Sequence, residues 1–573
     1  MKKILLFPLA AVLLTACSND DNSVQYTGEV ETGYLSVNLV TNFAGSRAEA
    51  DDFEQGSNAE NQVNKVRFYF FNSTGGAAAV KKQADGTFVN YFDWDASQDN
   101  NFGPAEDNNV TNILNAVIVI ENPADGSKDK EAHEAASIVA IINPTQEFYT
   151  KNTSSIAKSD LIDIVADYRA TAQGFVMSNS VYSDGAASPA SVIEVSTAGH
   201  VYTTPEAAKG DPVTIYVERV LAKIRLKTTL TPANATADED GYILYNTGGK
   251  YTDDQGQEKD IYVKFLNWDL TCAPDKSYLI KNITPTWDAD LLSLEEPWND
   301  ITRHRSYWAN NPDKDRFAYQ FSSFNTIAPT EPGVFVTTNN TRYTTENAGE
   351  ATDTDYNPTK VIIAAQLCNE DGDPLTIADY AFDRYLSLTD LKTKLLSLLY
   401  IKYYTEDAQN GTVESGSTKY RQIGLNDIEF VTAGSLDANN MTCYVYVQLT
   451  EAAKALPWVT ISNGTATTAQ ATSVDASLLA LGTSKIWELG RTYYYFDVEH
   501  LGTNSEGEPR TGVVRNHIYD ITITKLAGLG SPVYDPGEVI IPNKPTKDDT
   551  YIAAEIKVLS WRLVNQNVEL EWN

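Results

Sequence analysis

The side chains that most often carry out catalysis show no pattern typical of an active site in this 573-residue chain. The sequence contains no nucleophile elbow, no phosphate-binding loop and no His-Glu-x-x-His motif. The five histidines show no metal-ligand spacing and stand at His133, His200, His304, His500 and His517. A glycosidase pair of carboxylates stays open, because its two members need not be close in sequence. The sequence therefore predicts a protein that is not an enzyme and uses no metal or cofactor.

The chain is strongly acidic, with 77 Asp and Glu residues against 44 Lys and Arg residues and a formal net charge of −33. Such a surface repels phosphate backbones and anionic membranes, which argues against nucleic acid as a partner. We interpret the charge as a means of keeping an exported protein soluble. Two acidic clusters, 238–241 and 369–373, are similar to calcium loops. Neither matches the full twelve-residue pattern, so solvated turns are expected.

One cysteine stands where its thiol could accept a lipid. Two lysines and an apolar run, 4–14, are followed by a Leu-Thr-Ala-Cys sequence that ends at Cys17. The run is too short to span a bilayer, and small residues before a cysteine suit a lipoprotein signal peptidase. We therefore expect a signal peptide at 1–16 and lipidation of Cys17. The alternative is an ordinary signal peptide followed by an incidental cysteine.

The other three cysteines are an odd number without short spacing, which does not indicate a disulfide framework. Cys272 and Cys443 lie in strand-like runs, where we expect buried thiols that pack as small apolar groups. The third is Cys368.

A single arginine near the start of the chain could be the target of a trypsin-like protease. Arg47 is the only lysine or arginine in the range 18–64, so cleavage there would break the bond to Ala48. The alternative is an ordinary surface arginine. Arg219 is a competing target, but it lies in a strand-like run in which a protease could not easily extend the chain. We therefore predict that a leader, 17–47, is removed by proteolysis.

Two segments at opposite ends of the chain have the pattern of the same half-buried β-strand. The segments 34–40 and 551–557 both begin with tyrosine and then place an aliphatic or alanine side chain at every second position. Because strand side chains alternate between two faces, each segment would turn one apolar face to a core. These apolar residues are Leu35, Val37 and Leu39 in the first segment, and Ile552, Ala554, Ile556 and Val558 in and just after the second. We predict that cleavage displaces the first segment and that the second segment of a neighbouring molecule replaces it.

The rest of the chain has a β texture. Runs rich in Val, Ile, Thr and Tyr are separated by Gly, Asn, Asp and Pro. The strand-like runs are 66–71, 116–120, 137–142, 213–227, 361–368, 492–498 and 513–524. Helical spacing occurs over 161–168, after the candidate N-cap Ser159, and over 391–399, after Ser387. The sequence therefore predicts an all-β fold with a few inserted helices.

Two changes in composition divide the chain. The polar segment 231–240 follows the strand-like run 216–224, and we expect the main domain boundary within or just after that run. Four prolines fall within 526–549, which is predicted to be an extended arm because proline cannot donate to a ladder and stiffens a linker. The arm would present a C-terminal donor segment, 550–573. Its end, 568–572, either extends the donor strand or folds back.

A series of stretches recurs in an order that resembles one protein family. They are the lipobox at Cys17 and the ranges 45–48, 140–144, 176–179, 217–223, 513–519 and 556–561. Together they resemble the fimbrillins of Bacteroidales, the subunits of type V pili, and most closely the major structural subunit of the short fimbria. The resemblance extends from residue 17 to about residue 561, and the middle, roughly 230–490, matches no landmark.

This resemblance implies two transthyretin-like β-sandwich domains, for which we expect the limits 48–225 and 226–525. It implies an outer membrane lipoprotein precursor that an arginine-specific surface protease cleaves at Arg47. Identical subunits would then polymerise by donor-strand exchange into an extracellular fimbria with accessory tip and anchor proteins. The fimbria would support adhesion to a host or bacterial surface receptor. The alternatives are a monomeric surface lipoprotein that binds glycans, and a tip or anchor subunit of the same fimbria.

Overall fold

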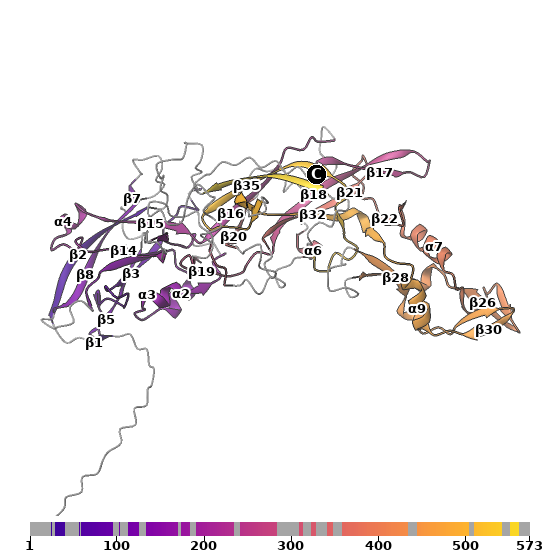
Figure 1. Ribbon diagram of the computed structural model, residues 1–573, viewed down its shortest axis with the longest axis horizontal. Helices are drawn as coiled ribbons and strands as arrows, with labels where there is room; N and C mark the ends of the chain where they lie inside the picture. Colours follow the sequence, from indigo (N-terminus) through magenta and orange to yellow (C-terminus); the bar gives the residue numbers. More distant parts are fainter. Residues whose placement is uncertain are drawn as a thin grey trace, which may run out of the picture.

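The strands of the computed structural model form two β-sandwiches and a smaller third module, arranged along an elongated molecule (Figure 1). The structure describes residues 24–25, 29–40, 57, 59–95, 102–103, 113–124, 133–169, 174–183, 191–233, 241–283, 309–312, 323–327, 341–347, 358–433, 444–503, 509–540 and 551–560. Strands dominate these residues and helices are few and short, so the predicted fold class is confirmed. No helix among them is long and apolar enough to cross a membrane.

The N-terminal sandwich contains two sheets that meet at β15. One runs in the order β6-β3-β9-β11-β15, and the other continues as β15-β2-β8-β7. The elements are β1 (Val24–Gln25), β2 (Glu29–Val40), β3 (Lys65–Phe71), β4 (Lys81–Lys82), β5 (Thr87–Val89), β6 (Tyr91–Asp95), β7 (Phe102–Gly103), β8 (Ile113–Ala124), β9 (Ser137–Ile142), α2 (Gln146–Lys151), α3 (Lys158–Ile162), β10 (Val165–Ala166), β11 (Met177–Asn179), β12 (Tyr182–Ser183), β13 (Ser191–Val192), β14 (Val195–Ser196), α4 (Pro205–Lys209) and β15 (Val213–Arg219).

The strands β3 and β9 are apolar on both faces because both faces are covered. One face joins the sandwich core, through Phe68 and Ile138 among others. The other face packs with α2 and α3, through Tyr69 and Phe148 among others. A strand that is covered on two sides reads as a continuous apolar run rather than an alternating one.

The C-terminal sandwich faces one sheet with the order β20-β16-β35-β37 toward a second with the order β17-β18-β21-β32-β36. Its core contains Ile224 from β16, Val263 from β18 and Ile521 from β35. The elements are β16 (Leu221–Thr228), β17 (Leu244–Thr252), β18 (Glu258–Thr271), β19 (Ser277–Tyr278), α6 (Phe324–Ile327), β20 (Thr341–Thr345), β21 (Lys360–Cys368), β32 (Arg491–Asp497), β33 (Glu499–Thr503), β34 (Pro509–Thr511), β35 (His517–Ala527), β36 (Ser531–Pro532) and β37 (Tyr551–Ser560). The chain passes between the sandwiches at Val220 alone, because β15 ends at Arg219 and β16 begins at Leu221.

A module that the sequence did not predict is inserted between β21 and β32 and extends beyond the C-terminal sandwich (Figure 1). It has its own core, in which Leu391, Phe430 and Trp458 are buried. Its first and last strands pair with each other. The elements are β22 (Ile377–Tyr380), β23 (Asp383–Tyr385), α7 (Leu388–Leu398), β24 (Tyr403–Glu406), β25 (Val413–Ser415), β26 (Thr418–Gln422), η5 (Leu425–Asp427), β27 (Ile428–Thr432), β28 (Val445–Leu449), α8 (Glu451–Lys454), β29 (Trp458–Ser462), β30 (Thr465–Thr468), α9 (Ala471–Leu479), β31 (Lys485–Trp487) and η7 (Glu488–Gly490).

The two predicted helices fare differently. The helix after Ser387 is confirmed as α7, and the Ser387 hydroxyl accepts a hydrogen bond from the backbone N–H of Asp390 at 3.1 Å. The helix expected over 161–168 is wrong in its limits. It is the short α3, which begins before Ser159 and ends at Ile162, and the chain continues into β10. Tertiary packing of Leu161 and Tyr168 in one core fixed their burial without a helix joining them.

The described part of the predicted arm packs on the C-terminal sandwich. β36 pairs with β32, and Val533 and Ile540 are buried against the outer face of that sheet. Residues 541–550 and the C-terminal residues 561–573, which include the 568–572 segment, lie outside the described residues. The limits of the arm and of the domains thus stay predictions.

Candidate strand-exchange site

The predicted displaced segment forms the second half of β2, and its apolar face lies in the core of the N-terminal sandwich. Leu35 and Val37 are 0% exposed and Leu39 is 1% exposed. They belong to one apolar core with side chains from β8 and β15, such as Ile118 and Ile215. Full burial of a side chain of this size is worth roughly 1.5–3 kcal/mol relative to exposure. The segment therefore contributes substantially to the stability of this sandwich.

β2 is an internal strand. It pairs antiparallel with β8 from Glu29 to Val40, and parallel with β15 along its last four residues. A third contact binds it to the loop before α4, where Tyr34 and Tyr202 exchange two backbone hydrogen bonds of 2.7 and 2.8 Å. Loss of β2 would leave the backbone groups of two neighbouring strands unpaired along a groove lined by apolar side chains.

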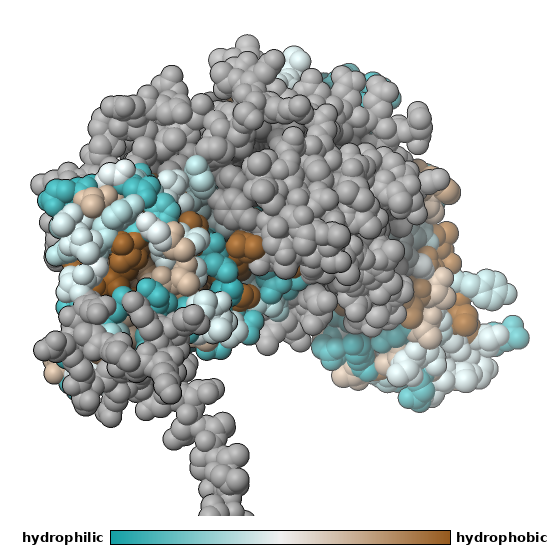
Figure 2. Space-filling model, turned by 60° about the vertical axis from the view of Figure 1, so that its left-hand side comes forward, coloured by the Kyte–Doolittle hydropathy of each residue, from teal (hydrophilic) through white to brown (hydrophobic). Residues whose placement is uncertain are grey.

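The surface around this strand is mixed. Figure 2 shows hydrophobic side chains among hydrophilic ones on the side of the molecule that carries the N-terminal sandwich. Among the described residues, its exposed large apolar side chains are Val119 on β8 and Val201 in the loop before α4, which are 42% and 40% exposed.

The predicted donor segment forms β37, at the edge of a sheet in the C-terminal sandwich. It pairs antiparallel with β35. Opposite residues in this pairing are Val558 and Tyr519, Ile556 and Ile521, and Ala554 and Ile523. A bulge follows, and after it Ile552 lies opposite Leu526. Directly opposed residues share one face of a sheet. The β35 residues opposite Val558, Ile556 and Ala554 are Tyr519, Ile521 and Ile523, and all three are buried.

The processing sites of the sequence analysis cannot be placed. Cys17, Arg47 and Ala48 lie outside the described residues, as does Cys443. Lipidation and cleavage at these positions stay predictions.

Three of the family landmarks of the sequence, 176–179, 217–223 and 513–519, meet at the junction between the two sandwiches. Arg219, the competing cleavage target, is fully buried there. Its backbone N–H and its guanidinium donate to the side-chain oxygen of Asn516, at 3.2 and 3.3 Å, and its Nε donates to the carbonyl oxygen of Glu60 at 3.0 Å. The guanidinium also donates to the side chain of Asn61. A protease could not reach Arg219 in this fold, because its backbone is paired within β15.

The segment 59–64 is the first described stretch of more than one residue after the predicted cleavage site, and Glu60 fixes it to the C-terminal sandwich. Its carboxylate accepts hydrogen bonds from Tyr343 at 2.6 Å and from Lys223 at 2.9 Å. Burial acts to raise the pKa of Glu60, but these hydrogen bonds outweigh it and hold the pKa below its ordinary value of 4.5. Glu60 is therefore ionised at neutral pH.

Two further buried ion pairs lie at the same junction. Lys281 contacts Glu218 of β15 at 2.9 Å, and both side chains are almost fully buried. Arg515 pairs with Glu346, through a bond of 2.8 Å from Nε, and donates to the carbonyl oxygen of Tyr278 at 2.7 Å. Removal of one partner of a buried pair leaves an uncompensated charge, which typically costs about 3–5 kcal/mol. The sequence reasoning missed this junction, although the charged pair at 218–219 inside an apolar run was its visible signal.

The described residues offer little that could do chemistry. No group of three or more His, Cys, Asp or Glu side chains among them could hold a metal ion. His517 is buried and its ring packs against that of His500, with 5.2 Å between centroids. Cys272 and Cys368 are buried free thiols, and burial raises the pKa of Cys272 to about 11.

The acidic cluster at 369–373 forms a turn in which the side-chain oxygen of Asn369 accepts backbone hydrogen bonds from Asp371 and Asp373, at 3.0 and 2.8 Å. Residues 234–240, which include most of the other acidic cluster, lie outside the described residues.

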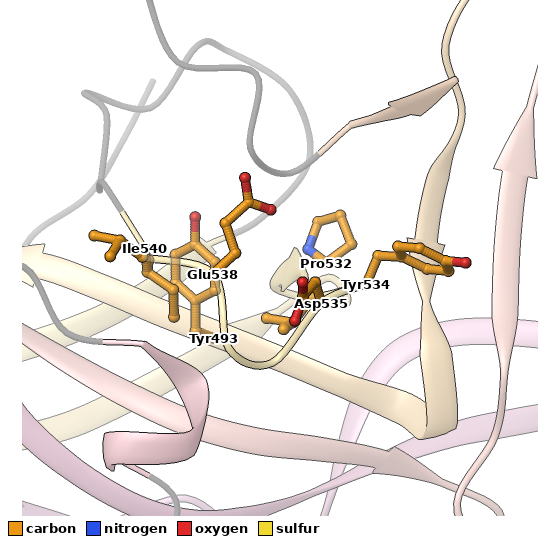
Figure 3. A pocket seen from close by; sticks show the side chains of 8 residues that line it. Tyr493, Pro532, Tyr534, Asp535, Glu538 and Ile540 are labelled. Atoms are coloured by element: carbon orange, nitrogen blue, oxygen red, sulfur yellow. The ribbon is translucent and has the colours of Figure 1, made fainter. Parts of the chain in front are cut away.

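A small pocket lies where the chain leaves β36 (Figure 3). Its labelled lining residues are Tyr493, Pro532, Tyr534, Asp535, Glu538 and Ile540. Its volume of about 10 Å³ is close to what one water molecule needs. Glu538 accepts a hydrogen bond from Thr432 of the inserted module at 3.2 Å. The pocket is thus part of the contact between the C-terminal sandwich and the module.

Comparison with known proteins identifies one region directly. Residues 485–567 match the family model described as the C-terminal part of fimbrillin, the major fimbrial subunit protein type IV. This range contains β32, β35, β36 and β37. No curated protein matches the chain.

Three solved structures illustrate the similarity to known folds. A protein assigned to cell adhesion from Bacteroides eggerthii is 11% identical, with a TM-score of 0.35 over 94% of this chain and 98% of that one. A fimbrilin from Porphyromonas gingivalis is 12% identical, with a TM-score of 0.34 over 93% and 99%. The tip fimbrial protein Mfa3 from the same species is 11% identical, with a TM-score of 0.31 over 93% and 100%.

These TM-scores are low, so the description of the fold rests on the sheets of this chain. The family match is independent of them, and it includes β35 and the C-terminal strand β37. The predicted resemblance to the fimbrillins is confirmed in this region. Residues 485–567 of this chain are thus similar to the C-terminal part of the fimbrillins.

Proposed function

We propose that this chain is the repeating structural subunit of a cell-surface fimbria. In this proposal a lipid on Cys17 carries the precursor to the outer membrane, and an arginine-specific protease cleaves after Arg47. The cleaved leader takes β2 with it, and the 551–558 segment of the next identical subunit fills the groove. The family match supports a fimbrial subunit that assembles with other fimbrial proteins.

The observation that carries the proposal is the place of β2 in the fold. A segment on the leader side of Arg47 occupies an internal position of a sandwich, between β8 and β15. Its removal opens two strand edges and exposes the pockets of Leu35, Val37 and Leu39. An open sheet edge with apolar pockets is a template for strand addition.

The energetics favour exchange once the leader has gone. In its own chain β37 pairs with one strand, whereas the groove would offer it two. Each additional ladder hydrogen bond contributes about 0.5–1.5 kcal/mol net. Before cleavage the covalently attached β2 occupies the groove, so the precursor stays monomeric.

The residues from Glu60 onward limit how much of the chain can leave after cleavage. Residues from Glu60 onward are held by Arg219, Lys223 and Tyr343. Loss of the leader therefore frees β2 without loosening the junction of the two sandwiches.

The test is a precursor in which only the cleavage site is changed. Wild-type precursor treated with an arginine-specific protease should form ladders of polymers on a denaturing gel without heating. Arg47→Ala should remain a monomer of precursor length, because the only lysine or arginine in 18–64 is gone.

Arg47→Lys is the matched control. It should resist the arginine-specific protease, and a lysine-specific protease should restore the ladders. Ladders in the uncleaved Arg47→Ala protein would overturn the proposed trigger. Complete cleavage of the wild type without ladders would instead favour a monomeric surface lipoprotein.

A further inference from the structure

Two positions of β2 leave no room for a larger side chain. The first is Ser36, which points away from the sandwich core because Leu35 and Val37 on either side of it point inward. It is nevertheless only 3% exposed. α4 packs against β2 and β8, and its Ala208 is also fully buried. The outer face of β2 at this point is therefore closed over a small side chain.

The second position is Gly33, which shares the inward face with Leu35. A Cβ atom placed on Gly33 would lie 2.6 Å from Cγ1 of Val201, well inside van der Waals contact. The loop that carries Val201 is held against β2 by the hydrogen bonds between Tyr34 and Tyr202. Any side chain at this point would have to move the Val201 side chain, and a larger one would have to move it further.

We infer that these two positions fix the register and the direction of the strand that replaces β2. The inference rests on the proposed function, since it concerns the same exchange between copies of this chain. Ala553 takes the place of Ser36, and the incoming strand runs in the same direction as β2. Ile552, Ala554 and Ile556 then take the places of Leu35, Val37 and Leu39.

Other registers with the same direction fail at Ser36. A shift of two residues places either Tyr551 or Glu555 in the closed outer position, and a shift of four places Lys557 there. A ring does not fit a serine-sized space, and an unpaired buried charge is costly. A shift of one residue turns Glu555 and Lys557 into the apolar core, which is excluded for the same reason.

The opposite direction fails at Gly33. If Ala553 is kept at Ser36 and the strand is reversed, Ile556 falls on Gly33. Its branched side chain would meet Val201. In the inferred register the residue at Gly33 is Thr550, which is smaller than isoleucine and precedes the first residue of β37. The strand itself thus begins just beyond the restricted point.

The register makes two adjacent alanines behave in opposite ways. Ala553 fills a closed space, so a larger side chain there blocks insertion. Ala554 replaces Val37 in the core and is smaller than the residue it replaces, so it leaves part of the pocket empty. Valine at this position restores the side chain that the groove accommodates in the precursor.

The test uses subunits that have been cleaved at Arg47 and are otherwise complete. A synthetic peptide of residues 551–560 is added, and this peptide should cap the growing end and stop polymerisation. The peptide with Ala554→Val should cap at about tenfold lower concentration, because two buried methyl groups are added. The peptide with Ala553→Leu should not cap. Because the substitutions are in the peptide, folding of the subunit is unaffected.

The same substitutions in the full chain provide a second reading. Cleaved Ala553→Leu subunits should form no ladders, and Ala554→Val ladders should dissociate about tenfold more slowly than wild type. The reverse pattern, with Ala554→Val inactive and Ala553→Leu neutral, would place Ala554 instead of Ala553 at a closed position and overturn the register. The register would also be overturned if both substituted peptides capped at the same concentration as the wild-type peptide. Absence of ladders from cleaved wild-type subunits would instead overturn the proposed function itself.

Discussion

β2 and β37 are both long amphipathic strands, but they hold opposite positions in their sheets. β2 lies between two strands of the N-terminal sandwich, whereas β37 pairs with β35 alone at the edge of the C-terminal sandwich. Loss of an internal strand leaves two unpaired edges, and loss of an edge strand leaves one. This difference supports the assignment of β2 as the displaced strand and β37 as the donor strand. The strand that can leave at lower cost is the one at the end of the chain.

The two halves of the molecule also differ in what fixes them. The groove side depends on a leader strand that proteolysis is proposed to remove. The junction side depends on buried charges, such as those of Arg219 and Glu60, that belong to the retained part of the chain. This separation predicts that substitutions in the two places will respond differently to cleavage.

The largest expected effect of a single substitution is in β2. Leu35→Ala should lower the free energy of unfolding of the precursor by about 2–5 kcal/mol, because it removes a fully buried side chain from the core. The same substitution should have no effect on the cleaved subunit, which has lost β2. Urea unfolding of both forms, followed by tyrosine and tryptophan fluorescence, measures the difference.

Val119→Ala is the control for Leu35→Ala, since this residue of β8 is 42% exposed and belongs to the retained chain. It should change both forms by less than about 0.5 kcal/mol. An equal loss of stability in the precursor and the cleaved subunit of Leu35→Ala would mean that β2 stays bound after cleavage.

A smaller effect is expected at the junction, where Glu60→Gln should act equally before and after cleavage. The pKa of Glu60 is lowered in the folded protein, so its ionised form stabilises the fold above the ordinary pKa of 4.5. This stabilisation is lost as the pH falls through the lower, folded-state pKa. Glu60→Gln should therefore cost about 1–2 kcal/mol at pH 7, and this cost should shrink as the pH falls below 4.5.

Thermal or urea unfolding across pH 3–7 measures this effect, with Glu147→Gln as the control. Glu147 is paired with Lys151 on the surface, where both side chains are more than half exposed. Such a pair contributes about 0–1 kcal/mol to the free energy of unfolding, so Glu147→Gln should hardly change the unfolding curves. A Glu60→Gln penalty that grows toward acid pH would contradict the role assigned to the ionised carboxylate.

Part of this structure could be predicted from the sequence because it depends on local pattern. The alternation of Leu35, Val37 and Leu39 predicted the buried face of β2, and Ser387 with its helical spacing predicted α7. The edge position of β37 and the internal position of β2 depend on sheet order, which a strand pattern does not encode.

The rest depends on residues far apart in the chain. The hydrogen bond from Tyr343 to Glu60 joins positions separated by 283 residues, and that from Arg219 to Asn516 joins positions separated by 297. The helix α4 packs against β2, and Val201 of the loop before it lies close to Gly33, but the strand pattern reveals neither. The inserted module escaped prediction because its limits depend on the pairing of β22 with β31, two strands far apart in the chain.

The most direct test of the account asks which strand β37 pairs with in a polymer. The experiment uses subunits that carry Ile552→Cys and Ile118→Cys, one batch isotopically labelled and one unlabelled. The two batches are mixed, cleaved at Arg47 and oxidised. Mass spectrometry then identifies the disulfide-linked peptides. Ile118 is the residue of β8 that faces Leu35, the position inferred for Ile552. Strand exchange should give disulfides between labelled and unlabelled subunits, and these should form only after cleavage. Polymers in which this disulfide never joins two subunits, and in which β37 remains paired with β35 of its own chain, would contradict it.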